Sequence, residues 1–100
     1  MSDKLNVEDT LEERGKAYGD YQLLSITAQS LRNAMRAGNW VSLSSWHREA
    51  LDMVAHKIAR IIHSPYYEGS QDPEAEEALK DSVRDIIGYM EIGFKDLFKK

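Results

Sequence analysis

The sequence predicts an all-α protein that folds as one small helical bundle. Apolar residues recur every three or four positions in long segments, and Gly, Pro, Asp and Ser stand between these segments. No alternating apolar–polar run bounded by turn residues is left over for a strand. The length of 100 residues, with 42% hydrophobic and 30% charged residues, fits a single domain over residues 1–100. We expect one short N-terminal helix, one medium helix and two long antiparallel helices.

The first helix is predicted to be short. Thr10 and Glu13 match the S/T-x-x-E capping box, in which a hydroxyl and a carboxylate each accept a hydrogen bond from an unpaired backbone N–H. Glycines follow at positions 15 and 19, so we expect the helix to fray beyond Tyr18. Residues 1–8 precede the helix and are expected to be flexible.

The second helix is predicted over residues 21–37. Gly38 follows it and would supply the left-handed residue that commonly ends a helix. Its apolar residues repeat at helical spacing and form one core face: Leu24, Ala28, Leu31 and Met35.

The third helix is predicted over residues 44–63. Ser44 can cap its start, and Pro65 opposes its continuation because it biases Ser64 away from helical geometry. The helix has two opposite faces. The apolar face comprises Leu51, Val54, Ile58, Ile61 and Ile62. The polar face comprises Glu49, Asp52, His56, Arg60 and His63.

The fourth helix is predicted over residues 73–97. Residues 64–71 form the one clear loop, and Asp72 then caps a helix with Pro73 at its first position. Because this loop is short, the helices at about 44–63 and 73–97 are expected to pack antiparallel. The predicted core stripe of the fourth helix comprises Leu79, Val83, Ile86, Ile87, Met90, Phe94 and Leu97.

Composition excludes several classes of protein. The chain has no cysteine, which rules out disulfide scaffolds, thiolate zinc sites and cysteine nucleophiles. No segment approaches the ~20 apolar residues of a membrane span, and the N-terminus lacks a signal-peptide core. The net charge of −4 argues against a duplex nucleic-acid partner. We therefore expect a cytoplasmic protein without a membrane partner. The modest core of a short chain and the apolar residues on several sides of the fourth helix predict a homo-oligomer.

Acidic residues on the two long helices form the most informative pattern. Glu49 and Asp52 are three residues apart, and Asp81 and Asp85 are four apart, so each pair shares one side of its helix. Packed antiparallel, the two helices could bring four carboxylates together as a site for Mg²⁺ or Mn²⁺. The alternative is that these are the solvated polar faces of amphipathic helices. Gly88 and Ile92 continue the line of Asp81 and Asp85, and a glycine in the middle of a helix indicates close packing on that side.

Basic residues lie on or beside the acidic stripe of the third helix. His56, Lys57 and Arg60 could neutralise the phosphates of a nucleotide. They could instead pair with Asp52 and Glu49 within the same helix, where the helical spacing also brings them close.

Three sequence blocks resemble a family of short proteins from tailed phages and prophages. The first block is ERGKAYGDY at 13–21, the second is REALDMVAHKIAR at 48–60, and the third is DSVRDIIGY at 81–89. The resemblance implies a phage- or prophage-encoded protein that acts in the cytoplasm of a host bacterium.

The chain also resembles the MazG-like, all-α nucleoside triphosphate pyrophosphohydrolases, whose signature is E-E-x-x-E on one helix and E-x-x-D on the next. Glu49 and Asp52 take the places of the E-x-x-E pair, and Asp85 takes the place of the terminal Asp. The resemblance implies that these three residues are catalytic. It also implies that, with Asp81, they hold Mg²⁺ while a nucleoside triphosphate is hydrolysed to release pyrophosphate.

Two positions depart from that signature. Ser82 stands where the second motif has its first glutamate, and Arg48 replaces the leading glutamate of the first motif. Both departures remove a carboxylate ligand from the predicted metal site. The alternative is therefore a non-catalytic phage accessory protein that sequesters a nucleotide or docks a helix of a host protein.

Overall fold

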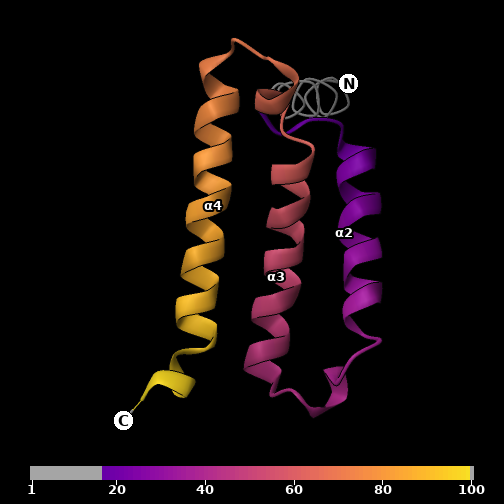
Figure 1. Cartoon of the computed structure of the whole chain (residues 1–100), viewed down its shortest axis with the longest axis vertical. Coiled ribbons are helices and arrows are strands. Elements are labelled where there is room, and N and C mark those ends of the chain that lie inside the picture. The colour runs from indigo at the N-terminus through magenta and orange to yellow at the C-terminus, as the bar shows by residue number, and fades with distance from the viewer. Residues whose placement is uncertain (1–16, 100) are drawn as a thin grey trace, which may run out of the picture.

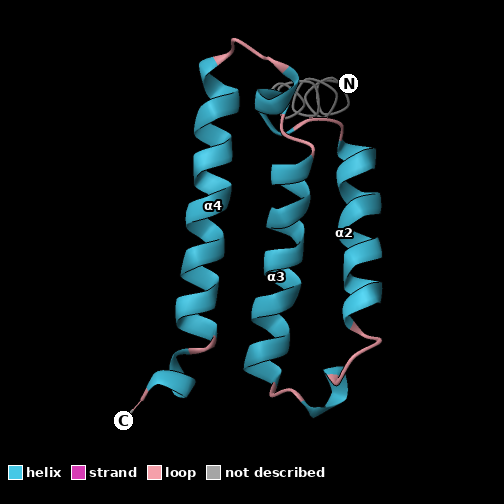
Figure 2. Cartoon of the chain, in the orientation of Figure 1, coloured by secondary structure: helices cyan, strands magenta, loops and turns pink. Residues whose placement is uncertain are grey.

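The computed structural model describes residues 17–99, and these contain helices and no β-strand (Figures 1 and 2). The α-helices are α2 (Tyr21–Met35), α3 (Ser45–Ile62) and α4 (Pro73–Gly93). Short 3-10 turns span Trp40–Ser42, Pro65–Glu68 and Lys95–Phe98. The predicted all-α class is confirmed. Of the short helix expected from Thr10, only Ala17 and Tyr18 lie within the described residues, and both are helical; the flexibility expected for residues 1–8 lies outside them.

Each long helix begins at a side-chain cap. The Asp20 carboxylate accepts hydrogen bonds from the backbone N–H groups of Gln22 and Leu23. The Ser44 hydroxyl accepts one from the N–H of His47, and the Asp72 carboxylate accepts one at the start of α4. These oxygens satisfy N–H groups that lack a partner within the helix. The caps predicted at residues 44 and 72 are therefore confirmed.

Helix α2 ends at Met35, two residues before the predicted end, and the prediction of a left-handed Gly38 is wrong. Within residues 17–99 a positive φ occurs only at Gly19 and Gly69. At the end of α2, the N–H groups of Ala37 and Gly38 donate to carbonyl groups three residues earlier. This tightened last turn satisfies the terminal carbonyls without a left-handed residue.

Helix α4 ends at Gly93 rather than near residue 97. A Cβ atom on Gly93 would clash with the side chain of Ala50, so α3 and α4 approach closely at this point. The next residue, Phe94, stacks its ring on the imidazole of His47 with 4.2 Å between centroids, and a 3-10 turn follows. Gly88, where close packing was predicted, has open space around its Cβ position within the chain.

Helix α3 lies between the other two helices. Figure 1 shows α4 returning alongside one side of α3 and α2 lying along its other side, and α2 does not pack against α4. The α2 side of α3 carries Ala59, which is buried in one cluster with Leu24 and Ala28. The three helices therefore form a single layer. No helix within residues 17–99 is long and apolar enough to cross a bilayer.

The predicted core stripe of α4 is wrong in its larger residues. Val83, Ile87, Met90 and Leu97 are exposed, and so is Ile62 of the predicted α3 stripe. The buried residues of α4 are instead small: Ala75, Ala78, Ser82 and Gly93. Both sets repeat at helical spacing, so periodicity could not choose between them. The small side chains are the buried ones because they let the backbones of α3 and α4 approach closely.

Candidate functional site

The seven predicted site residues come from two helices and do not converge on one point. Helix α3 carries Glu49, Asp52, His56, Lys57 and Arg60, and α4 carries Asp81 and Asp85. Among residues 17–99, no group of three or more His, Asp or Glu side chains is placed to hold a metal ion. The neighbours of each carboxylate explain this separation.

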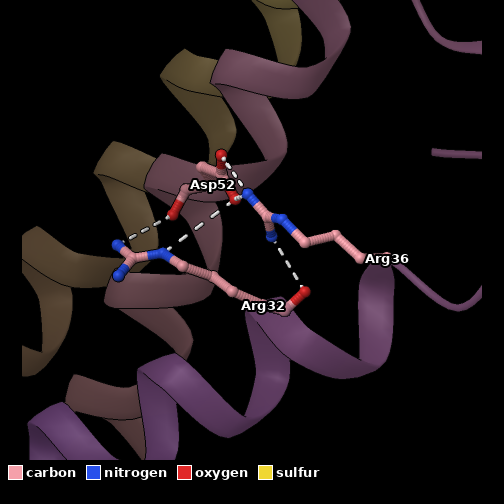
Figure 3. Close-up of polar contacts among 3 residues, drawn as sticks. All are labelled: Arg32, Arg36 and Asp52. Atoms are coloured by element: carbon pink, nitrogen blue, oxygen red, sulfur yellow. Dashed lines mark hydrogen bonds and ion pairs between the residues drawn. The ribbon is translucent and has the colours of Figure 1, made fainter. Parts of the chain in front are cut away.

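Asp52 is turned toward α2, where two arginines neutralise it (Figure 3). Nη2 of Arg36 lies 3.0 and 3.1 Å from its two carboxylate oxygens. Nε of Arg32 lies 4.0 Å from one of them, and Nη2 of Arg32 donates to the Asp52 backbone carbonyl at 3.4 Å. The predicted pairing with basic residues of its own helix does not occur, because the arginines of α2 hold this carboxylate.

The two carboxylates of α4 also have cationic partners. Asp85 lies 3.0 Å from Nζ of Lys57, whose side chain is only 12% exposed. Asp81 accepts a hydrogen bond of 2.7 Å from Arg84, one turn along the same helix. A divalent ion would have to displace these cations from both residues. The residues present therefore do not fit a shared Mg²⁺ or Mn²⁺ site in the single chain.

Glu49 lies apart from the other acids, at a shallow apolar pocket of about 260 Å³ between α3 and α4. The pocket is lined by Trp46, Glu49, Ala50, Met53, Tyr89, Ile92 and Gly93. Glu49 is the only carboxylate in this lining, so the pocket offers a divalent ion a single acidic ligand.

His56 and Arg60 do come together, in a second pocket of about 150 Å³ between α2 and α3. We call this the cationic–aromatic pocket; its lining is Tyr18, Gly19, Tyr21, Leu24, Ser25, His56 and Arg60. The Arg60 guanidinium lies over the ring of Tyr18, 4.4 Å from its centroid. Lys57, the third predicted nucleotide-binding residue, lies outside this lining because it pairs with Asp85.

Gly19 sets the position of Tyr18 in this pocket. Its φ of 94° lies in the left-handed region, and a Cβ atom there would clash with the backbone carbonyl of His63. Only glycine lets the chain pass so close to the end of α3. His63 is held at the same point by a 2.6 Å hydrogen bond between its Nε2 and the hydroxyl of Thr27.

Positive charge dominates the electrostatics of the cationic–aromatic pocket. Burial lowers the pKa of His56 below its ordinary value of 6.5, and the nearby charges of Arg60, Arg32 and Lys57 lower it further. His56 is therefore neutral at pH 7. Within residues 17–99, Arg60 has no carboxylate at ion-pair distance. An anion entering this pocket would meet charge that the described residues leave unbalanced.

Several residues of these sites were missing from the sequence-based prediction. Tyr18 and Tyr21 flank the Gly19–Asp20 turn within the first sequence block, and their position next to a helix start was the available signal. Arg32 lies in the last turn of α2 and Arg36 follows four residues later at its C-cap, so they predictably share one side of that helix. Which acid that side meets depends on how α2 packs against α3.

Comparisons with protein-family models, with curated proteins and with solved structures found no match to this chain.

Proposed function

We propose that the chain binds a small phosphorylated ligand of the nucleotide class in the cationic–aromatic pocket. One observation carries the proposal: the Arg60 guanidinium lies over the Tyr18 ring, in a partly enclosed pocket where burial and nearby cations lower the pKa of His56. Phosphate is the anion that a planar guanidinium recognises best, because it can accept two parallel hydrogen bonds.

The lining residues suit different parts of such a ligand. Arg60 would donate hydrogen bonds to phosphate oxygens. The negative charge of the phosphate would offset the repulsion between His56 and its neighbouring cations, so His56 would take up a proton when the ligand binds. The rings of Tyr18 and Tyr21 offer flat apolar surface for a base. At about 150 Å³ the pocket holds a phosphate group or one ring, since whole ligands fill about 300–1,000 Å³. The remainder of a nucleotide would lie outside it, along the open face of α3.

Two considerations support a nucleotide binder over a hydrolase. The resemblance of Glu49, Asp52 and Asp85 to the MazG-like signature favours a nucleotide among phosphorylated molecules. Two of the three acids that the resemblance implies as catalytic are neutralised, Asp52 by Arg32 and Arg36 and Asp85 by Lys57. We therefore favour a phage accessory protein that sequesters a nucleotide in the host cytoplasm. Mg²⁺-dependent release of pyrophosphate stays a prediction, which the experiment below also tests.

The test compares ligand binding by the wild type with two arginine variants in metal-free buffer. Inorganic phosphate, ATP, GTP and dATP are titrated by calorimetry and by thermal shift. We expect nucleotides to raise the melting temperature of the wild type. Arg60→Gln should weaken binding at least tenfold, whereas the matched Arg84→Gln, an exposed arginine of α4, should bind like the wild type.

Two outcomes would contradict the proposal. Equal binding by Arg60→Gln and the wild type would remove the pocket as the binding site. Release of pyrophosphate from ATP or dATP after addition of Mg²⁺, abolished in Glu49→Gln and Asp85→Asn, would replace the binder by the metal-dependent hydrolase.

A further inference from the structure

Three of the large exposed apolar side chains of α4 form a stripe away from its buried face. Val83, Ile87 and Met90 follow one another at spacings of four and three residues, so they lie on one side of the helix. They are 43%, 53% and 38% exposed. At 100° per residue this side lies about a third of a turn from the buried Ser82 and more than that from the buried Ala78.

Helix α3 extends this stripe across the layer. Ala50 of α3 meets α4 at Gly93, while Ala59, on the opposite side of α3, meets α2. Two faces of α3 therefore remain between its neighbours. One carries Glu49 and Arg60, and the other carries Leu51, Ile58 and Ile62. Because α4 returns antiparallel beside α3, its apolar stripe turns to the side of the layer that carries these three residues. We call the combined surface the aliphatic face: Leu51, Ile58, Ile62, Val83, Ile87 and Met90.

We propose that a second copy of this chain covers the aliphatic face. A stable domain buries the apolar side of each helix between two packed layers, and the described helices supply one layer. The interior of that layer is correspondingly poor. Its largest side chain with less than 2% exposure is Ser82, while Ile62 and Ile87 keep more than half of their surface in solvent. These side chains lack a second layer to pack against.

Charge and composition identify the occupant as a second copy. In a two-fold dimer the same patch meets itself, so like charges on it would repel each other. The aliphatic face has no charged member, whereas the opposite face of α3 carries Glu49 and Arg60. The chain's own residues 1–16 are a poor cover, because eight of them are charged and only four are apolar.

The area involved is adequate for a dimer. The exposed fractions of Val83, Ile87, Met90 and Ile62 correspond to on the order of 350 Å² of apolar surface, close to half of the ~800 Å² that each partner buries in a standard interface. Leu51 and Ile58, which are partly exposed, lie in the same face and add to it.

The test measures the mass of the full-length chain in solution by light scattering at about 10 to 100 µM. We expect twice the chain mass of 11.4 kDa for the wild type. Ile87→Glu places a charge in the aliphatic face and should return the mass to that of one chain, with helical circular dichroism retained. The matched control is Ile92→Glu, which alters a 72% exposed residue on another side of α4 and should leave the dimer intact.

A wild-type mass of one chain across this range would overturn the proposal, as would a dimer that survives Ile87→Glu and is lost in Ile92→Glu. If Ile87→Glu unfolds, the concentration dependence of the wild-type melting temperature decides between dimer and monomer. The melting temperature of a folded dimer rises by about a few degrees for each tenfold increase in protein concentration, whereas that of a monomer does not change. None of these readouts depends on ligand binding in the cationic–aromatic pocket.

Discussion

Arg36, the residue that follows the last turn of α2, donates from one nitrogen, Nη2, to both carboxylate oxygens of Asp52 on α3, at 3.0 and 3.1 Å. Nη1 of the same arginine donates to the backbone carbonyl of Arg32 at 2.8 Å, which fixes the guanidinium at the end of α2 (Figure 3). An acid that resembles a catalytic metal ligand therefore joins two helices.

Asp52→Asn is expected to destabilise the chain. The change removes the charged partner of Arg36 and leaves Arg36 and Arg32 close together without a carboxylate between them. The free energy of unfolding should fall by about 1 kcal/mol, because the pair is partly solvent-exposed. Urea unfolding in EDTA measures it. The control is Asp81→Asn, whose acid pairs within one helix and should change stability by less than about 0.5 kcal/mol. A metal-free protein made more stable by Asp52→Asn would instead indicate repulsion within a carboxylate site.

Asp85→Asn should destabilise more than Asp81→Asn. It leaves the ammonium of Lys57, which is 12% exposed, without its charged partner, and we expect a loss of about 1–3 kcal/mol. Replacing both residues, as Lys57→Met with Asp85→Asn, removes the unpaired charge and should recover part of the loss. The double-mutant cycle is read from urea unfolding midpoints. Equal effects of Asp85→Asn and Asp81→Asn would contradict this role of Lys57.

His56 should make stability depend on pH. Its pKa in the folded chain lies below 6.5, so below pH 6.5 the unfolded chain binds more protons than the folded one. The stability that the neutral imidazole contributes is complete above pH 6.5 and is lost as the pH falls through the folded pKa. Urea unfolding should therefore show that the free energy of unfolding falls less between about pH 7.5 and about pH 5 for His56→Gln than for the wild type. Identical losses would contradict the lowered pKa.

The two glycines at positions 19 and 88 should respond oppositely to alanine. Gly19→Ala forces a left-handed φ on alanine and a clash with the carbonyl of His63, which should reduce stability by about 1–3 kcal/mol. Gly88→Ala adds a methyl group to open space in the middle of α4 and should raise stability by about 0.5–1 kcal/mol. Thermal unfolding of both variants checks the pair. A destabilising Gly88→Ala would indicate that another surface packs closely there.

The sequence alone was sufficient for the class and for the starts of the helices. Helical spacing, the absence of strand patterns and the caps at Ser44 and Asp72 are local properties, decided by groups within a few residues of each other. It also placed His56 and Arg60 on one side of a helix, and both line the cationic–aromatic pocket.

Only the tertiary structure decided which stripe is buried and which charges meet. The large apolar residues of α4, such as Val83, and its small residues, such as Ser82, both recur at helical spacing. The small residues are buried because α3 and α4 approach closely at Gly93. An acid at helical spacing can serve equally well as a metal ligand or as an ion-pair partner. Its role depends on which neighbouring helix supplies the opposite charge, and for Asp52 that is α2, whose packing against α3 no local pattern specifies.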